Sequence, residues 1–168
     1  LWSDLVIARQ LLADLAGAER ACLHAMRLYA GCDDERSLGS ALYNLAEIRL
    51  RRGRLHGLRE ILERLEAADE KARDLRRLVQ DAELWVRYEL AQGRAHAALE
   101  RCEEALRLLA RRGDVWRRDD LHALAARSLG WLSKPQAAAV HLAQVSSAAL
   151  QRFEPEERSA LFALAGDR

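Results

Sequence analysis

Strand-forming residues are scarce in this chain of 168 residues. Threonine is absent, and valine and isoleucine together supply nine residues. Because sheets are built mainly from β-branched and aromatic residues, this scarcity excludes a sizeable sheet. The two prolines are Pro135 and Pro155, so long uninterrupted helices are possible over most of the chain.

The chain also has few cysteines and no excess of one charge. The three cysteines, Cys22, Cys32 and Cys102, form no CxxC pair, which argues against a disulfide framework or a structural zinc site and favours a reducing cytoplasm. Twenty-seven basic residues face 26 acidic ones, so nucleic acid is not an expected partner. No apolar run approaches the ~18 residues of a membrane span, so we expect no membrane partner either.

Helix-forming residues make up most of what is present. Alanine and leucine supply 31 residues each, and arginine and glutamate supply 25 and 15. These residue types have high helix propensity, and apolar residues recur at helical spacing between glycines. The sequence therefore predicts an all-α chain with nine helices, at 2–15, 19–30, 34–52, 55–67, 70–92, 95–111, 117–132, 136–150 and 155–164.

The glycines mark a repeat. Gly17, Gly53 and Gly93 each follow one helical pattern and precede another, and Ser133 is the fourth equivalent point, so the spacings are 36, 40 and 40. Apolar or small residues recur five, nine and twelve positions later, which is one face of a helix. The first repeat matches least well. The residues five positions after each anchor are Cys22, Leu58, Ala98 and Ala138.

Stacked helical hairpins explain this pattern better than two alternatives. A long coiled coil is disfavoured by the glycine breaks and by the lack of a sustained seven-residue seam. A four-helix bundle needs fewer and longer helices than the sequence predicts. We therefore expect one helical-repeat domain over residues 1–168, and because the chain begins with Leu1 it is compatible with a piece of a longer protein.

Two segments resemble the tetratricopeptide repeat (TPR). Residues 41–53 are similar to the first helix of such a repeat, with the small residue Ala46 seven positions before Gly53, and residues 97–106 are similar to the second helix, with Ala98 and Ala105. The period of about 40 exceeds the usual 34. It resembles the longer repeats in the sensor regions of large bacterial transcription activators and signalling ATPases. This resemblance implies an α-α superhelix of about four hairpins, closed by a short helix at 155–164.

The resemblance also implies a function. Stacked hairpins of this kind form a concave groove, lined by the first helix of each pair, that binds proteins or peptides. We therefore expect a scaffold or sensor part of a bacterial regulator, with no cofactor. In the family register the groove positions are Tyr43, Glu47, Leu50 and Arg51, then Glu83, Arg87 and Leu90, and finally Asp120, Arg127 and Trp131.

Two other functions remain open. In the first, the divergent first repeat or the final helix exposes apolar surface to a second copy, and changing Leu161 or Phe162 to Asp would dissociate the homodimer. In the second, the groove encloses a small-molecule effector near Trp131. Tyr43 and Trp131 either bind a partner in the groove or pack between helices.

An enzyme is not expected. The chain has no HExxH, phosphate-binding loop, GxGxxG or GxSxG motif. His56 and His96 share a repeat position about one helix-packing distance apart, which is too far for one zinc ion, and His24, His122 and His141 share none. The basic clusters at Arg49–Arg54 and Arg111–Arg118 are best explained as arginines that meet the dipoles at helix C-termini.

Overall fold

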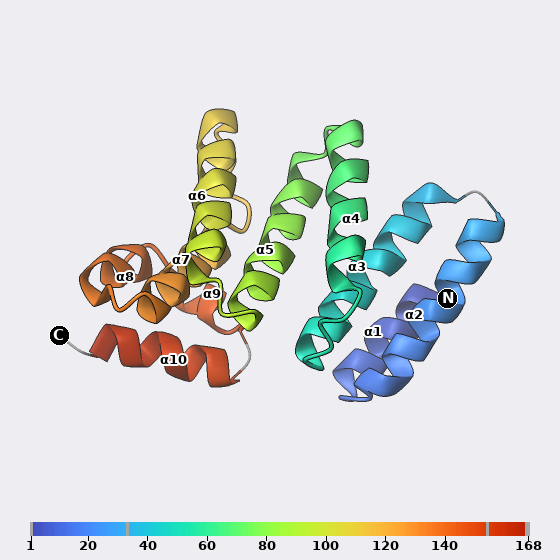
Figure 1. Ribbon diagram of the computed structural model, residues 1–168, viewed down its shortest axis with the longest axis horizontal. Helices are drawn as coiled ribbons and strands as arrows, with labels where there is room; N and C mark the ends of the chain where they lie inside the picture. The colour runs from blue at the N-terminus through green and yellow to red at the C-terminus, as the bar shows by residue number, and fades with distance from the viewer. Residues whose placement is uncertain (1, 33, 154, 167–168) are drawn as a thin grey trace. The chain divides into compact units, whose positions relative to one another are not determined.

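The computed structural model describes residues 2–32, 34–153 and 155–166, which form helices and no strand (Figure 1). The predicted all-α fold is confirmed. The helices, joined by short turns, are α1 (Trp2–Leu11), α2 (Leu15–Gly31), α3 (Glu35–Arg51), α4 (Leu58–Ala72), α5 (Leu75–Ala91), α6 (Ala95–Arg112), α7 (Arg118–Trp131), α8 (Pro135–Leu142), α9 (Ser147–Leu150) and α10 (Pro155–Gly166).

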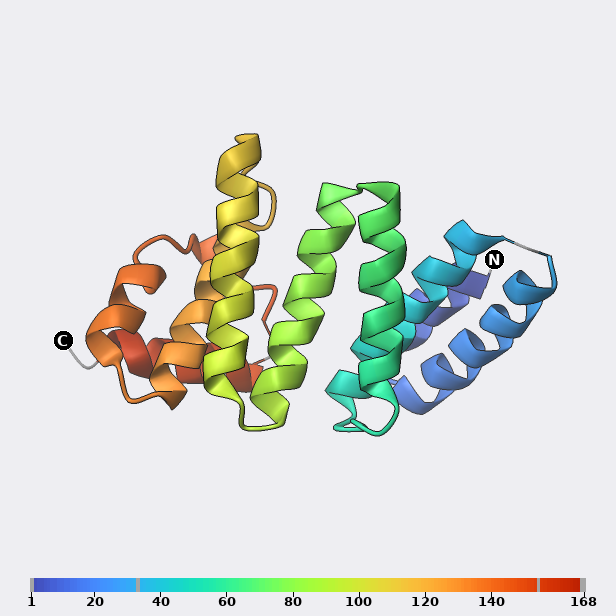
Figure 2. The same ribbon diagram turned by 45° about the horizontal axis from the view of Figure 1, so that its top comes forward.

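The chain divides into two compact units, Leu1–Arg77 and Leu78–Arg168. In unit 1, α2 packs against both α1 and α3, and α3 packs against α4. In unit 2, α7 packs against α6 and α8, and α10 lies against α7 and α8 (Figure 2). None of the helices in the described ranges is long and apolar enough to span a membrane.

One turn of each hairpin recurs every 40 residues. Ala13, Gly53, Gly93 and Ser133 all have a left-handed backbone, with φ of 58°, 65°, 75° and 56°. The next residue then donates its N–H to the carbonyl five positions earlier, which closes the preceding helix. These hydrogen bonds, at 2.8–2.9 Å, are Asp14 to Arg9, Arg54 to Arg49, Arg94 to Glu89 and Lys134 to Leu129.

The predicted position of the first turn was wrong. Gly17 lies inside α2, and the turn is at Ala13, so the helix predicted at 2–15 ends at Leu11. The three spacings are therefore all 40, instead of 36, 40 and 40. The search for a glycine missed Ala13 because alanine rarely adopts positive φ. With Ala13 as anchor, Val6 takes the buried place of Ala46, and the first repeat matches the others.

The opposite turn of each hairpin follows the same period. Asp34, Asp74 and Asp114 each donate a backbone N–H to the carbonyl five residues earlier, at 3.1 Å. The carboxylates of Asp34 and Asp74 also accept hydrogen bonds from the backbone of the next helix, as N-terminal capping residues do. The Asp114 carboxylate accepts from the N–H of Trp116, in the turn before α7. The neighbouring acidic residue Asp33, which could also cap α3, lies outside the described residues.

Small and apolar residues at the corrected repeat positions form the cores. Ala18, Leu58, Ala98 and Ala138, five positions after each turn, are fully buried. Cys22 and Cys102 lie four residues further on, on the same face of the helix, and are also buried as free thiols. Burial raises the pKa of the Cys22 thiol to about 12.

The C-terminal quarter departs from the predicted helices at one place. The helix predicted at 136–150 is broken into α8 and α9, and Ser146 caps α9 by accepting from the N–H of Ala149. The backbone N–H of Ser146 donates a hydrogen bond to the carboxylate of Asp119, in the first turn of α7, at 3.1 Å. The predicted closing helix is present as α10, where Leu161 is buried.

Candidate functional site

In unit 1, the predicted groove residues lie on α3. Tyr43, Glu47 and Arg51 are spaced four residues apart, so they lie on one side of the helix, with Arg51 exposed and the other two half-buried. Ile7 and Leu11 of α1 hold the repeat positions of Glu47 and Arg51, and Leu11 is 82% exposed. The sequence analysis missed both because its first turn was four residues out of place. We call these five residues the first-helix face of unit 1.

In unit 2, the predicted groove residues have different surroundings. Glu83 of α5 is buried, and Arg87 lies over the ring of Phe153 at 5.8 Å. Arg127 of α7 pairs with Glu157 of α10. Trp131, at the repeat position of Leu11, is 60% exposed. Arg87, Arg127 and Trp131 form the first-helix face of unit 2, while Glu83 lies beneath the surface.

Glu83 belongs to a charge cluster with Arg117, Asp120 and Arg152, in which the two carboxylates are buried and Arg152 is half exposed. The Arg117 Nε lies 2.9 Å from Glu83 Oε1 and 3.1 Å from Asp120 Oδ2. Arg152 Nη2 lies 2.8 Å from the other Asp120 oxygen. Burial outweighs the nearby arginines and raises the pKa of Glu83 to about 7. The cluster thus joins α5, the start of α7 and the segment after α9.

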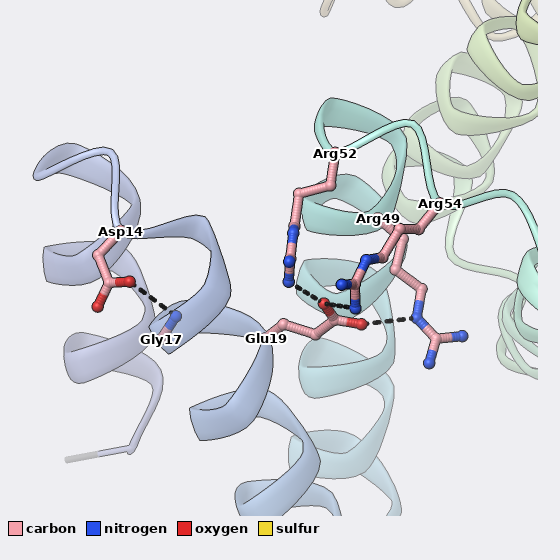
Figure 3. Close-up of polar contacts among 6 residues, drawn as sticks. All are labelled: Asp14, Gly17, Glu19, Arg49, Arg52 and Arg54. Atoms are coloured by element: carbon pink, nitrogen blue, oxygen red, sulfur yellow. Dashed lines mark hydrogen bonds and ion pairs between the residues drawn. The ribbon is translucent and has the colours of Figure 1, made fainter.

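A second charge cluster lies in unit 1 (Figure 3). Glu19 of α2 is buried and binds Arg49 at 3.2 Å, Arg54 at 3.3 Å and Arg52. All three arginines come from the end of α3 and the turn after it. These arginines were predicted to meet only the helix dipole. They also pair with a carboxylate of the preceding hairpin.

The histidines form a pair that the sequence analysis missed. Nδ1 of His122 in α7 lies 3.0 Å from Nδ1 of His141 in α8. Burial lowers the pKa of both rings, and for His122 the other ring adds to the effect. The two residues lie eleven before and eight after Ser133, so the hairpin turn brings them together. Within the described ranges no three His, Cys, Asp or Glu residues gather as metal ligands.

A pocket of about 430 Å³ opens in unit 1 between α3, α4 and the first residues of α5. Its polar lining contains Asp69, which is buried, and Arg77, whose Nη1 lies 3.5 Å from the Asp69 carboxylate. No residue of the pocket was among the predicted site residues. The complete lining is Glu35, Arg36, Ala68, Asp69, Ala72, Asp74 and Arg77.

Comparisons with known proteins identify the fold. No protein-family model matches the chain, and no curated protein matches it. Two crystal structures of nearly identical TPR-like repeats, attributed to a kinesin light chain of Podosopora anserina, are similar to it with a TM-score of 0.72 and 20% identity. One of the two carries a point substitution. In each case 99% of this chain is matched to 86% of the other.

Proposed function

We propose that this TPR-like chain is a protein- or peptide-binding module that acts as the scaffold or sensor part of a cytoplasmic bacterial regulator. The observation that supports it most is the exposure of large apolar side chains at one repeat position, Leu11 in unit 1 and Trp131 in unit 2. Exposed apolar side chains that lie together frequently mark a surface that binds a partner. Arginine lies on the same face in both units, and aromatic residues and arginine are frequent binding anchors.

The nature of the partner follows from the mixture of side chains. In unit 1 the first-helix face combines the aliphatic residues Ile7 and Leu11 of α1 with Glu47 and Arg51 of α3, and α1 contacts α3. An amphipathic peptide that places apolar side chains on Ile7 and Leu11, and a carboxylate on Arg51, fits this chemistry. No catalytic step is proposed for either face.

A peptide library tests the proposal. Peptides selected on the intact protein should bind it, and Leu11→Glu or Trp131→Glu should weaken binding by about tenfold or more, because each change buries a charge in the interface. Val140→Glu is the matched control, since Val140 is equally exposed but lies on the second helix, α8. Peptides that lose affinity only with Val140→Glu, or with no variant, would contradict the proposed face.

Self-association is a second candidate, and one observation favours it. Phe162 of α10 is exposed, whereas its neighbour Leu161 belongs to the core of unit 2. Leu161→Asp would therefore disrupt folding, and only Phe162→Asp tests the interface. Light scattering coupled to size exclusion should show a dimer that Phe162→Asp converts to a 19.0 kDa monomer. A concentration-independent monomer in the unmodified chain would exclude this candidate.

A further inference from the structure

The pocket in unit 1 contains a carboxylate where the repeat places apolar residues. Asp69 has Tyr29, Leu109 and Ala149 at its equivalent positions in the other repeats, and Leu109 and Ala149 are core residues. Asp69 itself is 5% exposed. Burying a carboxylate costs free energy unless strong partners compensate. A charged residue in this place is unexplained by folding alone.

The partner of Asp69 within the unit is a weak one. Arg77 Nη1 lies 3.5 Å from Asp69 Oδ1, which is the outer limit of a hydrogen bond, and Arg77 Nε lies 3.8 Å from Asp74 Oδ2. Gly39 of α3 leaves room for this guanidinium, because a Cβ there would lie 3.3 Å from Arg77 Nη1. One arginine is thus shared at long distance between two carboxylates. An additional cation would improve the balance.

The charges around the pocket favour a cation. Three carboxylates, from Glu35, Asp69 and Asp74, face two guanidinium groups, from Arg36 and Arg77. Ala68 and Ala72, one helical turn apart, supply an apolar wall. The volume falls within the range of small-molecule sites.

We propose that this pocket binds an aliphatic primary amine, with its ammonium group on Asp69 and Asp74 and its carbon chain along Ala68 and Ala72. The amine belongs either to a free small molecule or to a lysine side chain of a peptide, and the chemistry of recognition is the same. The site lies at the first turn of α3, away from Tyr43, Glu47 and Arg51. It is therefore independent of the first-helix face, and either proposal can fail without the other.

Calorimetric titration of the intact protein tests the site with three probes. 1,5-Diaminopentane represents the free amine, Nα-acetyl-lysine amide represents the side chain, and 1-pentanol is the uncharged control. Binding of at least one amine, without binding of the alcohol, is expected. Preference for the diamine would indicate a free metabolite, and preference for the lysine derivative would indicate a peptide. Equal binding of amine and alcohol would overturn the proposal.

Variants then locate the binding. Asp69→Asn keeps the shape of the side chain and removes its charge, so amine affinity should fall about tenfold or more. Glu70→Gln is the matched control, because Glu70 is the exposed neighbour on α4 and does not line the pocket. Ala72→Leu fills the pocket and should abolish binding while Asp69 remains, which guards against a folding defect in Asp69→Asn. Unchanged affinity in Asp69→Asn and Ala72→Leu would place the amine elsewhere.

Discussion

The two units stabilise their buried carboxylates in different ways. In unit 1, Glu19 is surrounded by three arginines from one short segment, the end of α3 and the turn after it. In unit 2, Glu83 and Asp120 share Arg117, and Arg152 completes the cluster from the far side of α9. In unit 1 three positive charges surround one negative charge, whereas in unit 2 two positive charges balance two negative charges.

The number of ion pairs in a cluster does not measure how much the cluster contributes to stability. The arginines around Glu19 differ in exposure, because the side chain of Arg54 is 59% exposed whereas Arg49 and Arg52 are largely covered. Exposed ion pairs contribute little, because water and salt screen them. Glu19 is buried too, but the loss of one of its arginines leaves two others. In unit 2 two buried carboxylates share two arginines, so the loss of one partner leaves a buried charge. We therefore expect the removal of one charged residue to lower the free energy of unfolding more in unit 2 than in unit 1.

Removing Asp120 is expected to have the largest effect. Asp120→Asn leaves Arg152 without its carboxylate and Arg117 with Glu83 alone, and should lower the free energy of unfolding by about 4 kcal/mol. Urea unfolding followed by tryptophan fluorescence measures it, since three of the four tryptophans, Trp85, Trp116 and Trp131, lie in unit 2. Asp119→Asn is the control, and should cost less than about 0.5 kcal/mol because an amide oxygen can still accept from Ser146. Equal effects would show that Asp120 is not special.

The raised pKa of Glu83 gives the next largest effect, and it depends on pH. A carboxyl group whose pKa is higher in the folded chain stabilises the fold below its unfolded pKa of 4.5, and this stabilisation is lost as the pH rises through about 7. Glu83→Gln should therefore be more stable than the unmodified chain above pH 7, by about 3 kcal/mol, and equally stable below pH 4.5.

The difference between the two chains is the quantity to measure. His122 and His141 act in the opposite sense, because their lowered pKa values destabilise the fold as the pH falls below 6.5. Subtracting the urea-unfolding free energies of Glu83→Gln and the unmodified chain at each pH removes this contribution. A difference that does not change between pH 4.5 and 7 would mean that Arg117 keeps Glu83 ionised throughout.

In unit 1 the effects should be smaller. Glu19→Gln leaves three arginines near one another and should cost about 2 kcal/mol, because Arg49 and Arg52 are largely covered. Arg54→Ala should cost less than about 0.5 kcal/mol, since Arg54 is exposed and two arginines remain on Glu19. Urea unfolding followed by far-ultraviolet circular dichroism compares them. A larger loss for Arg54→Ala than for Glu19→Gln would reverse our ranking of the three arginines.

Local patterns predicted the fold, but contacts between distant residues decided the clusters. Helices and the turns at Gly53 and Gly93 follow from propensity and from the conformational freedom of glycine. Glu19 and Arg49 are 30 residues apart, and Glu83 and Arg117 are 34 apart. Their pairing depends on which helix faces which, and in unit 1 the misplaced first turn also hid the register of Glu19. With a period of 40, Glu19 falls in the second helix of the hairpin before the Gly53 turn. This placement would have suggested its pairs with the arginines around that turn.

The repeat turns should show the smallest effect and no difference between the units. Ala13 in unit 1 and Ser133 in unit 2 have a left-handed backbone, which is unfavourable for residues with a Cβ. Glycine relieves this strain but also gives the unfolded chain more freedom, so Ala13→Gly and Ser133→Gly should each raise the free energy of unfolding by about 0.5 kcal/mol. Gly53→Ala and Gly93→Ala are the reciprocal controls and should each lower it. Equal gains at positions 13 and 133 would show that the turns contribute locally and alike, and that the charge clusters are what distinguish the two units. Unequal gains would mean that the contribution of a turn to the free energy of unfolding depends on the unit in which it lies.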